Sequence, residues 1–186
     1  MDDFSLYVLD ITMNSVRAGG QNIAIRLEEK GPWLFFSVTD DGCGMTEEQV
    51  RNLSDPFFTT RKTRKVGLGV PFLKMLAEGT GGELHISSKS QLDHPDDHGT
   101  VLEATFGRKH LDFIPLGDLG ETVLTLIQGS PNVNFTFDHI TGSGTVHLSC
   151  EELRAVLGED ISLAEPEILA WIRDFLRESY QSLENK

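Results

Sequence analysis

An acidic residue followed by two closely spaced glycines is the most informative motif in the sequence. It follows a predicted strand over residues 34–39 and reads Asp40-Asp41-Gly42-Cys43-Gly44-Met45. Glycine has no Cβ, so Gly42 and Gly44 allow the backbone to approach a flat ligand closely. The Asp40 carboxylate can accept a hydrogen bond from an exocyclic amine, as an adenine ring requires. Asp-Gly pairs also make ordinary turns, so the prediction of an adenine site depends on what accompanies the motif.

A carboxylate and an amide lie four residues apart nearer the start of the chain. Residues 4–18 have apolar side chains at helical spacing and precede two glycines, which predicts a helix. Asp10 and Asn14 then project from one face, one turn apart. Mg²⁺ prefers oxygen ligands and keeps several waters, so Asn14 could serve as its protein ligand beside phosphates. Asp10 could orient or deprotonate a water or hydroxyl. In isolation, the pair is more typical of a solvated polar face.

A basic segment with two further glycines precedes the next predicted helix, over residues 69–78. Gly67 and Gly69 flank Leu68 where this helix begins. Backbone N–H groups at a helix N-terminus form an anion site, helped by the helix dipole. Two lysines in the predicted loop over residues 55–68 can supply positive charge to a triphosphate; they are Lys62 and Lys65. A flexible basic loop is the alternative interpretation.

The remaining elements have to position these residues. Alternating apolar positions predict strands over residues 22–28, 33–39, 83–88 and 100–106, the last two paired with each other. Thr100 begins the last of these strands, where its hydroxyl can bond adenine directly or through water. A short helix is expected after Thr46, because Gln49 three residues later completes a capping box.

The composition shifts after Phe106. Residues 107–120 are loop-rich, and residues 133–140 and 144–148 alternate like a hairpin. Two further capping patterns each predict a helix, the second longer than the first; they are Ser149 with Glu152 and Ser162 with Glu165.

Overall composition restricts the classes of function. The 186 residues carry a formal net charge of −13, which argues against general nucleic-acid binding. The two cysteines cannot build a disulfide framework, and no apolar run reaches the roughly 20 residues of a membrane span. We therefore expect a cytoplasmic protein without a membrane span, and its oligomeric state stays open.

Taken together, the motifs resemble the ATP-binding fold shared by gyrase, the ninety-kilodalton heat-shock chaperones, histidine kinases and MutL-type mismatch-repair proteins. The likeness covers roughly residues 4–107 and is nearest to sensor histidine kinases. In the family's order, the matching motifs are Asp10-x-x-x-Asn14-Ser15-x-x-Ala18-Gly19, Asp40-x-Gly42-x-Gly44-Met45, Asp55-Pro56-Phe57-Phe58-Thr59-Thr60 through Gly67-Leu68-Gly69, Gly81-Gly82-Glu83-Leu84-x-Ile86-x-Ser88, and Gly99-Thr100-x-x-x-Ala104-x-Phe106.

This resemblance implies an α+β fold for residues 1–107, a two-layer α/β sandwich with helices on one face of a mixed sheet. It implies Mg²⁺ and ATP as cofactors. The expected roles are Asp10 as base, Asn14 as magnesium ligand and Asp40 as adenine reader. The other expected nucleotide contacts are Arg17, Gly42, Gly44, Met45, Lys62, Lys65, Gly67, Leu68, Gly69 and Thr100. Residues 108–186 are expected to form a small α+β appendage of unknown role.

Two departures from the kinase pattern bear on the activity. Only nine residues precede Asp10, so we expect no helical hairpin carrying a phosphorylated histidine and no autophosphorylation on one in cis. Asp10 also stands where the family often has glutamate. The first hypothesis is a stand-alone kinase or ATPase that acts on a separate partner protein or phosphoacceptor in signalling. The second is a nucleotide-switched binding protein with little catalysis, and the third is a relic that binds no nucleotide, which the complete glycine motifs disfavour.

Overall fold

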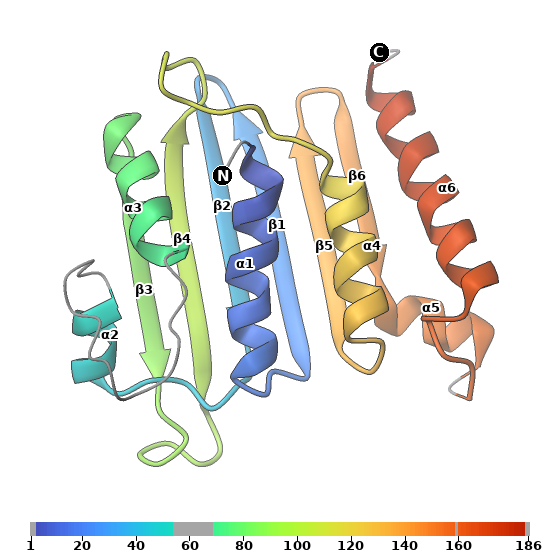
Figure 1. Cartoon of the computed structure of the whole chain (residues 1–186), viewed down its shortest axis with the longest axis horizontal. Coiled ribbons are helices and arrows are strands. Elements are labelled where there is room, and N and C mark those ends of the chain that lie inside the picture. The colour runs from blue at the N-terminus through green and yellow to red at the C-terminus, as the bar shows by residue number, and fades with distance from the viewer. Residues whose placement is uncertain (1–2, 54–68, 159, 185–186) are drawn as a thin grey trace.

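One mixed sheet of six strands organises the part of the chain that the computed structural model describes, residues 3–53, 69–158 and 160–184 (Figure 1). Its spatial order is β3-β4-β2-β1-β5-β6. Neighbouring strands are antiparallel except for β1 and β5, which run parallel. The strands are β1 (Asn22–Lys30), β2 (Trp33–Asp40), β3 (Leu84–Lys89), β4 (Gly99–Gly107), β5 (Asn134–Thr141) and β6 (Gly144–Ser149).

Helices cover one face of this sheet. Figure 1 shows α1, α3 and α4 side by side in front of the strands, with α6 beyond β6. In β1, Ile23, Ile25 and Leu27 are buried while the residues between them are exposed, so one face carries the core. The expected α+β, two-layer fold is therefore confirmed. The helices are α1 (Phe4–Arg17), α2 (Glu47–Leu53), α3 (Gly69–Gly79), α4 (Leu119–Gly129), α5 (Cys150–Leu157) and α6 (Pro166–Glu184).

The capping patterns met different outcomes. The box before α2 is confirmed, because Thr46 N donates to Gln49 Oε1 at 2.9 Å and Gln49 N donates to Thr46 Oγ1 at 3.3 Å. Ser149 caps α5 as expected, accepting from the N–H of Glu152. The prediction for Ser162 was wrong: its hydroxyl accepts from the N–H of Ala164, and α6 begins only at Pro166.

Helix α4 is absent from the sequence-based prediction, which assigned residues 107–120 to loops. The N-cap that starts it is Asp118, whose Oδ1 accepts from Glu121 N at 2.9 Å. Gly120 lies inside the first turn and is a poor helix former. Asp118 and Glu121, three residues apart, nevertheless form a pattern that indicates the start of a helix.

The C-terminal strands extend the sheet instead of forming one of their own. β5 lies parallel to β1, and Asn134 N donates to Gln21 O at 2.8 Å where the pair begins. α4 packs between α1 and α6. A boundary between two domains at residue 107 stays a prediction, whereas the hydrogen-bonded sheet is continuous across it.

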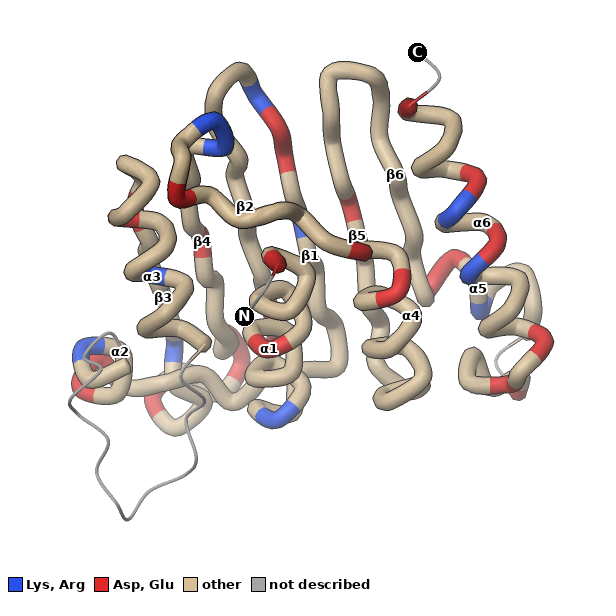
Figure 2. The backbone as a smooth tube through the Cα atoms, turned by 45° about the horizontal axis from the view of Figure 1, so that its top comes forward, with Lys and Arg blue, Asp and Glu red and all other residues tan. Residues whose placement is uncertain are grey.

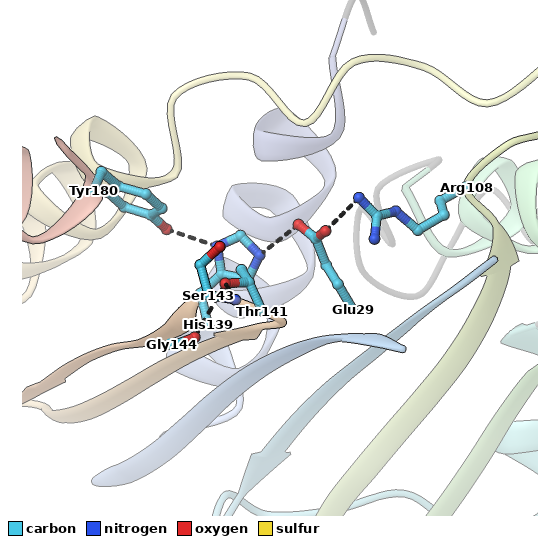
Figure 3. Close-up of polar contacts among 7 residues, drawn as sticks. All are labelled: Glu29, Arg108, His139, Thr141, Ser143, Gly144 and Tyr180. Carbon is cyan, nitrogen blue, oxygen red and sulfur yellow. Dashed lines mark hydrogen bonds and ion pairs between the residues drawn. The ribbon is translucent and has the colours of Figure 1, made fainter. Parts of the chain in front are cut away.

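A buried polar chain joins β1, β5 and α6 (Figure 3). His139 is 3% exposed; its Nδ1 lies 3.0 Å from the Tyr180 hydroxyl and its Nε2 lies 3.1 Å from Glu29 Oε1. An ionised carboxylate only accepts, so Nε2 carries the proton and Nδ1 accepts from Tyr180. Arg108 forms an ion pair with Glu29 at the end of the chain of contacts. Burial lowers the pKa of His139 and outweighs the Glu29 carboxylate, which raises it.

The sign of this pKa change predicts how stability responds to acid. The unfolded chain binds a proton at His139 before the folded chain does, so stability is full above the ordinary histidine pKa and falls as the pH drops through the folded value. The loss should appear as a lower Tm in acid than at neutral pH. We expect His139→Gln to reduce the fall in Tm between pH 7.5 and 5.5, measured by thermal denaturation.

His147 provides the control with the opposite sign. A hydrogen bond that His147 donates to Asp138 raises the pKa of His147, so its contribution to stability is present at low pH and lost as the pH rises through the folded value. His147→Gln should therefore not reduce the loss of Tm in acid. If both variants kept the wild-type profile, the acid response would not originate at His139.

Candidate functional site

Helix α1 brings three of the predicted motifs together. A Cβ built on Gly69, the first residue of α3, would lie 1.9 Å from Asp10 Oδ2, so the Asp10 carboxylate rests against this glycine. Asn14 follows one turn later. Ser15, the next residue, donates from its hydroxyl to Asp40 Oδ2 at 2.5 Å. The same helix therefore contacts the start of α3 and the end of β2.

Asp40 is the buried carboxylate of this group. It is 9% exposed, and besides Ser15 it accepts from the backbone N–H of Gly42, at 2.9 Å. A carboxylate has about four acceptor positions, so these two hydrogen bonds leave capacity for an amine. Thr100, on β4, is its Cα partner across the β2–β4 pair. The predicted adenine reader and the predicted threonine are therefore neighbours.

The neighbouring acid has a different role. Asp41 Oδ1 accepts from the backbone N–H groups of Gln21 and Asn22 at 2.7 and 2.9 Å, and Oδ2 accepts from the Asn22 side chain at 2.7 Å. Burial raises the pKa of Asp41, but the hydrogen bonds from Asn22 and Gln21 together outweigh it and leave the pKa lowered. Asp41 ties the loop after β2 to the start of β1.

The two glycines of the first motif are needed for contacts within the chain. Gly44 has φ +62°, and a Cβ there would lie 1.9 Å from the carbonyl oxygen of Lys89. A Cβ on Gly42 would lie 2.9 Å from the carbonyl oxygen of Ala18. Close packing thus requires both glycines even before a ligand is considered. Their approach to a nucleotide, and that of Met45, stays a prediction.

Ser88 links the adenine motif to the strands behind it, which the sequence did not indicate. Its hydroxyl accepts from the backbone N–H of Met45 at 2.8 Å and lies 2.9 Å from both Gly99 O and Thr100 Oγ1. Ser88 ends one of the motifs that match the family, but neither that motif nor its place at the end of a predicted strand indicated a hydrogen-bonding partner. Ser88 and Ser15 are both polar residues of the site to which sequence reasoning gave no role.

We expect Ser88→Ala to lower the free energy of unfolding by about 1–3 kcal/mol, because the half-buried N–H of Met45 loses its acceptor. Ser87→Ala is the matched control: Ser87 is exposed on the opposite face of β3, and its replacement should change stability by less than about 0.5 kcal/mol. Urea denaturation measures both. Equal losses would contradict the assigned role of Ser88.

His98 is the second residue whose surroundings differ from its sequence context. It lies in a polar loop with several acids, yet its Nδ1 donates to the carbonyl oxygen of Gly42 at 2.6 Å. Within the described ranges, no group of three or more His, Cys, Asp or Glu side chains could hold a metal ion. The histidine therefore braces the loop after β2.

The residues expected near magnesium offer oxygen donors. Asn14 Oδ1 accepts a hydrogen bond from Arg17 Nη1 at 3.0 Å, so this amide oxygen already contacts a positively charged group. One amide oxygen beside the Asp10 carboxylate suits a hard cation that keeps several waters. Both residues therefore fit the group that the resemblance implies. Lys62, Lys65, Gly67 and Leu68 lie outside the described residues.

Comparison with known proteins agrees with this geometry. The family model described as histidine kinase-, DNA gyrase B- and HSP90-like ATPase matches residues 2–110. The chain belongs to this family. The match spans α1 through the end of β4, which are the elements that carry the described part of the site.

Curated members of the family include sensor kinases. The chain is 31% identical over 90 residues to the sensor histidine kinase ZraS of Escherichia coli K12, covering 47% of this chain and 19% of that protein. It is 30% identical over 87 residues to sporulation kinase B of Bacillus subtilis, covering 45% of this chain and 20% of that kinase. The aligned segment is thus about a fifth of each kinase, and it supports an ATP-binding domain of histidine-kinase type.

A solved structure extends the likeness beyond the family's segment. The MutL ATPase domain of Aquifex aeolicus, solved with ADP, superposes with a TM-score of 0.54 over 84% of this chain and 69% of that one, at 16% identity. This shows a shared fold, and the coverage reaches into the C-terminal strands and helices. Of the helices in the described part of the chain, none is long and apolar enough to cross a membrane.

Proposed function

We propose that this family member binds Mg·ATP and transfers or hydrolyses the γ-phosphate, acting in trans on a partner protein in signalling from the cytoplasm. The observation that carries this is the position of α1. One helix carries Asp10, which lies against the first residue of α3, and Ser15, which bonds Asp40. The candidate base and the candidate adenine reader are therefore connected through α1.

The chemistry follows from the residues present. Asp40 would accept from the adenine amine, and Thr100 would contribute its hydroxyl nearby. The backbone N–H groups at the start of α3 favour negative charge, which suits phosphate. Asn14 would hold Mg²⁺, which when bound neutralises phosphate charge. Asp10 would orient or deprotonate the attacking water or acceptor hydroxyl.

The role of Arg17 in this proposal depends on its present partner. Its guanidinium donates to the oxygen of Asn14 that would bind Mg²⁺. Two cations cannot share that oxygen without strong repulsion. Arg17 would therefore leave Asn14 when Mg·ATP binds and turn to the phosphates, where a positive charge is stabilising.

A nucleotide-switched regulator with little catalysis is the alternative. The pairing of the strands supports this alternative, because β5 of the C-terminal region hydrogen-bonds directly to β1 of the family domain. A change at the nucleotide could then reach that region without phosphoryl transfer.

ATP labelled at the γ-phosphate distinguishes these functions. Label on this protein, or on proteins encoded by neighbouring genes when they are added, supports a kinase. Release of labelled phosphate supports an ATPase. Binding measured by calorimetry without either outcome supports the switch. No binding at millimolar Mg·ATP would reject all three, because each requires the nucleotide.

A further inference from the structure

Helix α6 carries more apolar surface than the core uses. Leu169, Ile172 and Leu176 are buried against the rest of the molecule. Trp171 and Phe175 lie on an adjoining stripe and remain 52% and 36% exposed. Their rings stack with centroids 5.5 Å apart and an angle of 8° between planes. Two large aromatic side chains that stack on each other and remain exposed to water are typical of an interaction surface.

The charges of α6 are divided between its sides. Arg173 forms an ion pair with Glu121, and both Arg173 and Arg177 line a cavity of about 620 Å³ beside the start of α4. Arg173 is thus paired with Glu121, and Arg177 lies on the same cavity-lining side of the helix. Figure 2 marks both signs of charge along α6.

Acidic residues accompany the aromatic pair. Glu167 and Asp174 lie four residues before and three after Trp171, and Glu178 lies three after Phe175, so helical geometry places them around the rings. All three are exposed, and none forms an ion pair with another described residue. The surface made by Trp171, Phe175 and these three acids is called the α6 stripe below.

We propose that the α6 stripe binds a protein segment whose apolar residues are flanked by Lys or Arg, such as a basic amphipathic helix. The aromatic pair supplies the apolar anchor and the acids select a positive flank. Phosphate-rich nucleic acid and anionic membrane surfaces would be repelled by the same acids. A second copy of this chain would bring an identical acidic flank, which like-charge repulsion disfavours.

In Figure 1, α6 lies at the opposite end of the sheet from α2 and α3, so the stripe is separate from the nucleotide site.

A fluorescence titration tests this without any nucleotide, so its result is independent of the ATP proposal. The chain has two tryptophans, and Trp33→Phe leaves Trp171 as the reporter. The probe is a tryptophan-free Leu/Lys amphipathic helical peptide of about 18 residues, and its twin carries Glu in place of Lys. We expect the Lys peptide to shift Trp171 emission to the blue, and to bind at least about tenfold more weakly in about 0.5 M salt. The Glu twin should not bind.

Charge-matched variants localise the binding. A triple variant should bind the Lys peptide at least about tenfold more weakly; its substitutions are Glu167→Gln, Asp174→Asn and Glu178→Gln. A control triple variant removes the same charge from exposed positions on α2 and α3, with Glu47→Gln, Glu48→Gln and Glu78→Gln. It should change the affinity for the Lys peptide less than about twofold. Circular dichroism confirms that both variants fold.

Phe175→Ala, in the Trp33→Phe background, should also weaken the peptide. The proposal is overturned if the Lys peptide does not bind at about 100 μM, a range in which recognition is already weak. Equal binding of the twins, or equal losses in the two triple variants, would overturn it as well. Light scattering that shows a dimer with Trp171 emission already blue-shifted would identify a second copy as the occupant and reject the basic partner.

Discussion

Asp40→Asn should weaken ATP binding by about 10- to 100-fold, because a hydrogen bond to a charged group contributes about 1.5–3 kcal/mol and each 1.4 kcal/mol is tenfold. The asparagine keeps the size of the side chain and can still accept from Ser15 or Gly42. Its amide nitrogen, however, would face the donor amine of adenine. Isothermal titration calorimetry with Mg·ATP measures the loss.

Asp41→Asn is the matched control for this prediction. The same charge is removed one residue later, but Asp41 is held by Gln21 and Asn22 and fastens the loop to β1. This variant should lower Tm with a smaller effect on affinity, whereas Asp40→Asn should mainly change affinity. If Asp40→Asn bound ATP as the wild type does, the assignment of the adenine reader would be wrong.

Asp10→Asn should lower turnover by about 10²- to 10⁴-fold, the usual contribution of a general base. Amide and carboxylate have nearly the same shape, so the side chain can still rest against Gly69. ATP affinity should therefore stay within about threefold of the wild type, because the lost proton acceptor matters only in the chemical step. Phosphate release or transfer at saturating ATP measures turnover, and calorimetry measures affinity.

The two variants together separate the roles. Asp40→Asn should recover part of its turnover at high ATP, while Asp10→Asn should not recover at any concentration. Unchanged turnover in Asp10→Asn would remove Asp10 from the role of base. Because Asp10 is an aspartate where the family often has glutamate, Asp10→Glu is an informative third variant. Higher turnover in it would mean that the shorter side chain limits the native rate.

Local patterns predicted the elements of the family segment well. The helix at Phe4, the alternating strands β1 and β2 and the capping box at Thr46 all depend on residues a few positions apart, and sequence records such spacing directly. The resemblance also named Asp10 and Asp40. Nothing local indicated that Ser15 would bond Asp40, since 25 residues separate them and the contact arises only when α1 packs on the sheet.

The C-terminal region was less predictable for the same reason. Its hairpin followed from alternation, but the pairing of β5 with β1 is a long-range choice that no nearby residue specifies. His139 illustrates the limit: alternation with Phe137 places it on the buried face of β5, but its partners Glu29 and Tyr180 are 110 and 41 residues away in sequence. Helix α4 was missed because Gly120 and the preceding loop residues obscured its N-cap.

The parallel pairing of β1 with β5 also has a consequence for how the chain folds. Strand β1 leaves the ribosome before β5, its second neighbour in the sheet, which is complete only at Thr141. Until then the N–H and C=O groups along one edge of β1 have no strand to pair with, and such edges recruit other chains. Contacts this distant in sequence also slow folding. During synthesis, the family's ATP-binding segment therefore passes through a stage in which an open strand edge must be kept from aggregation, and the C-terminal hairpin ends that stage.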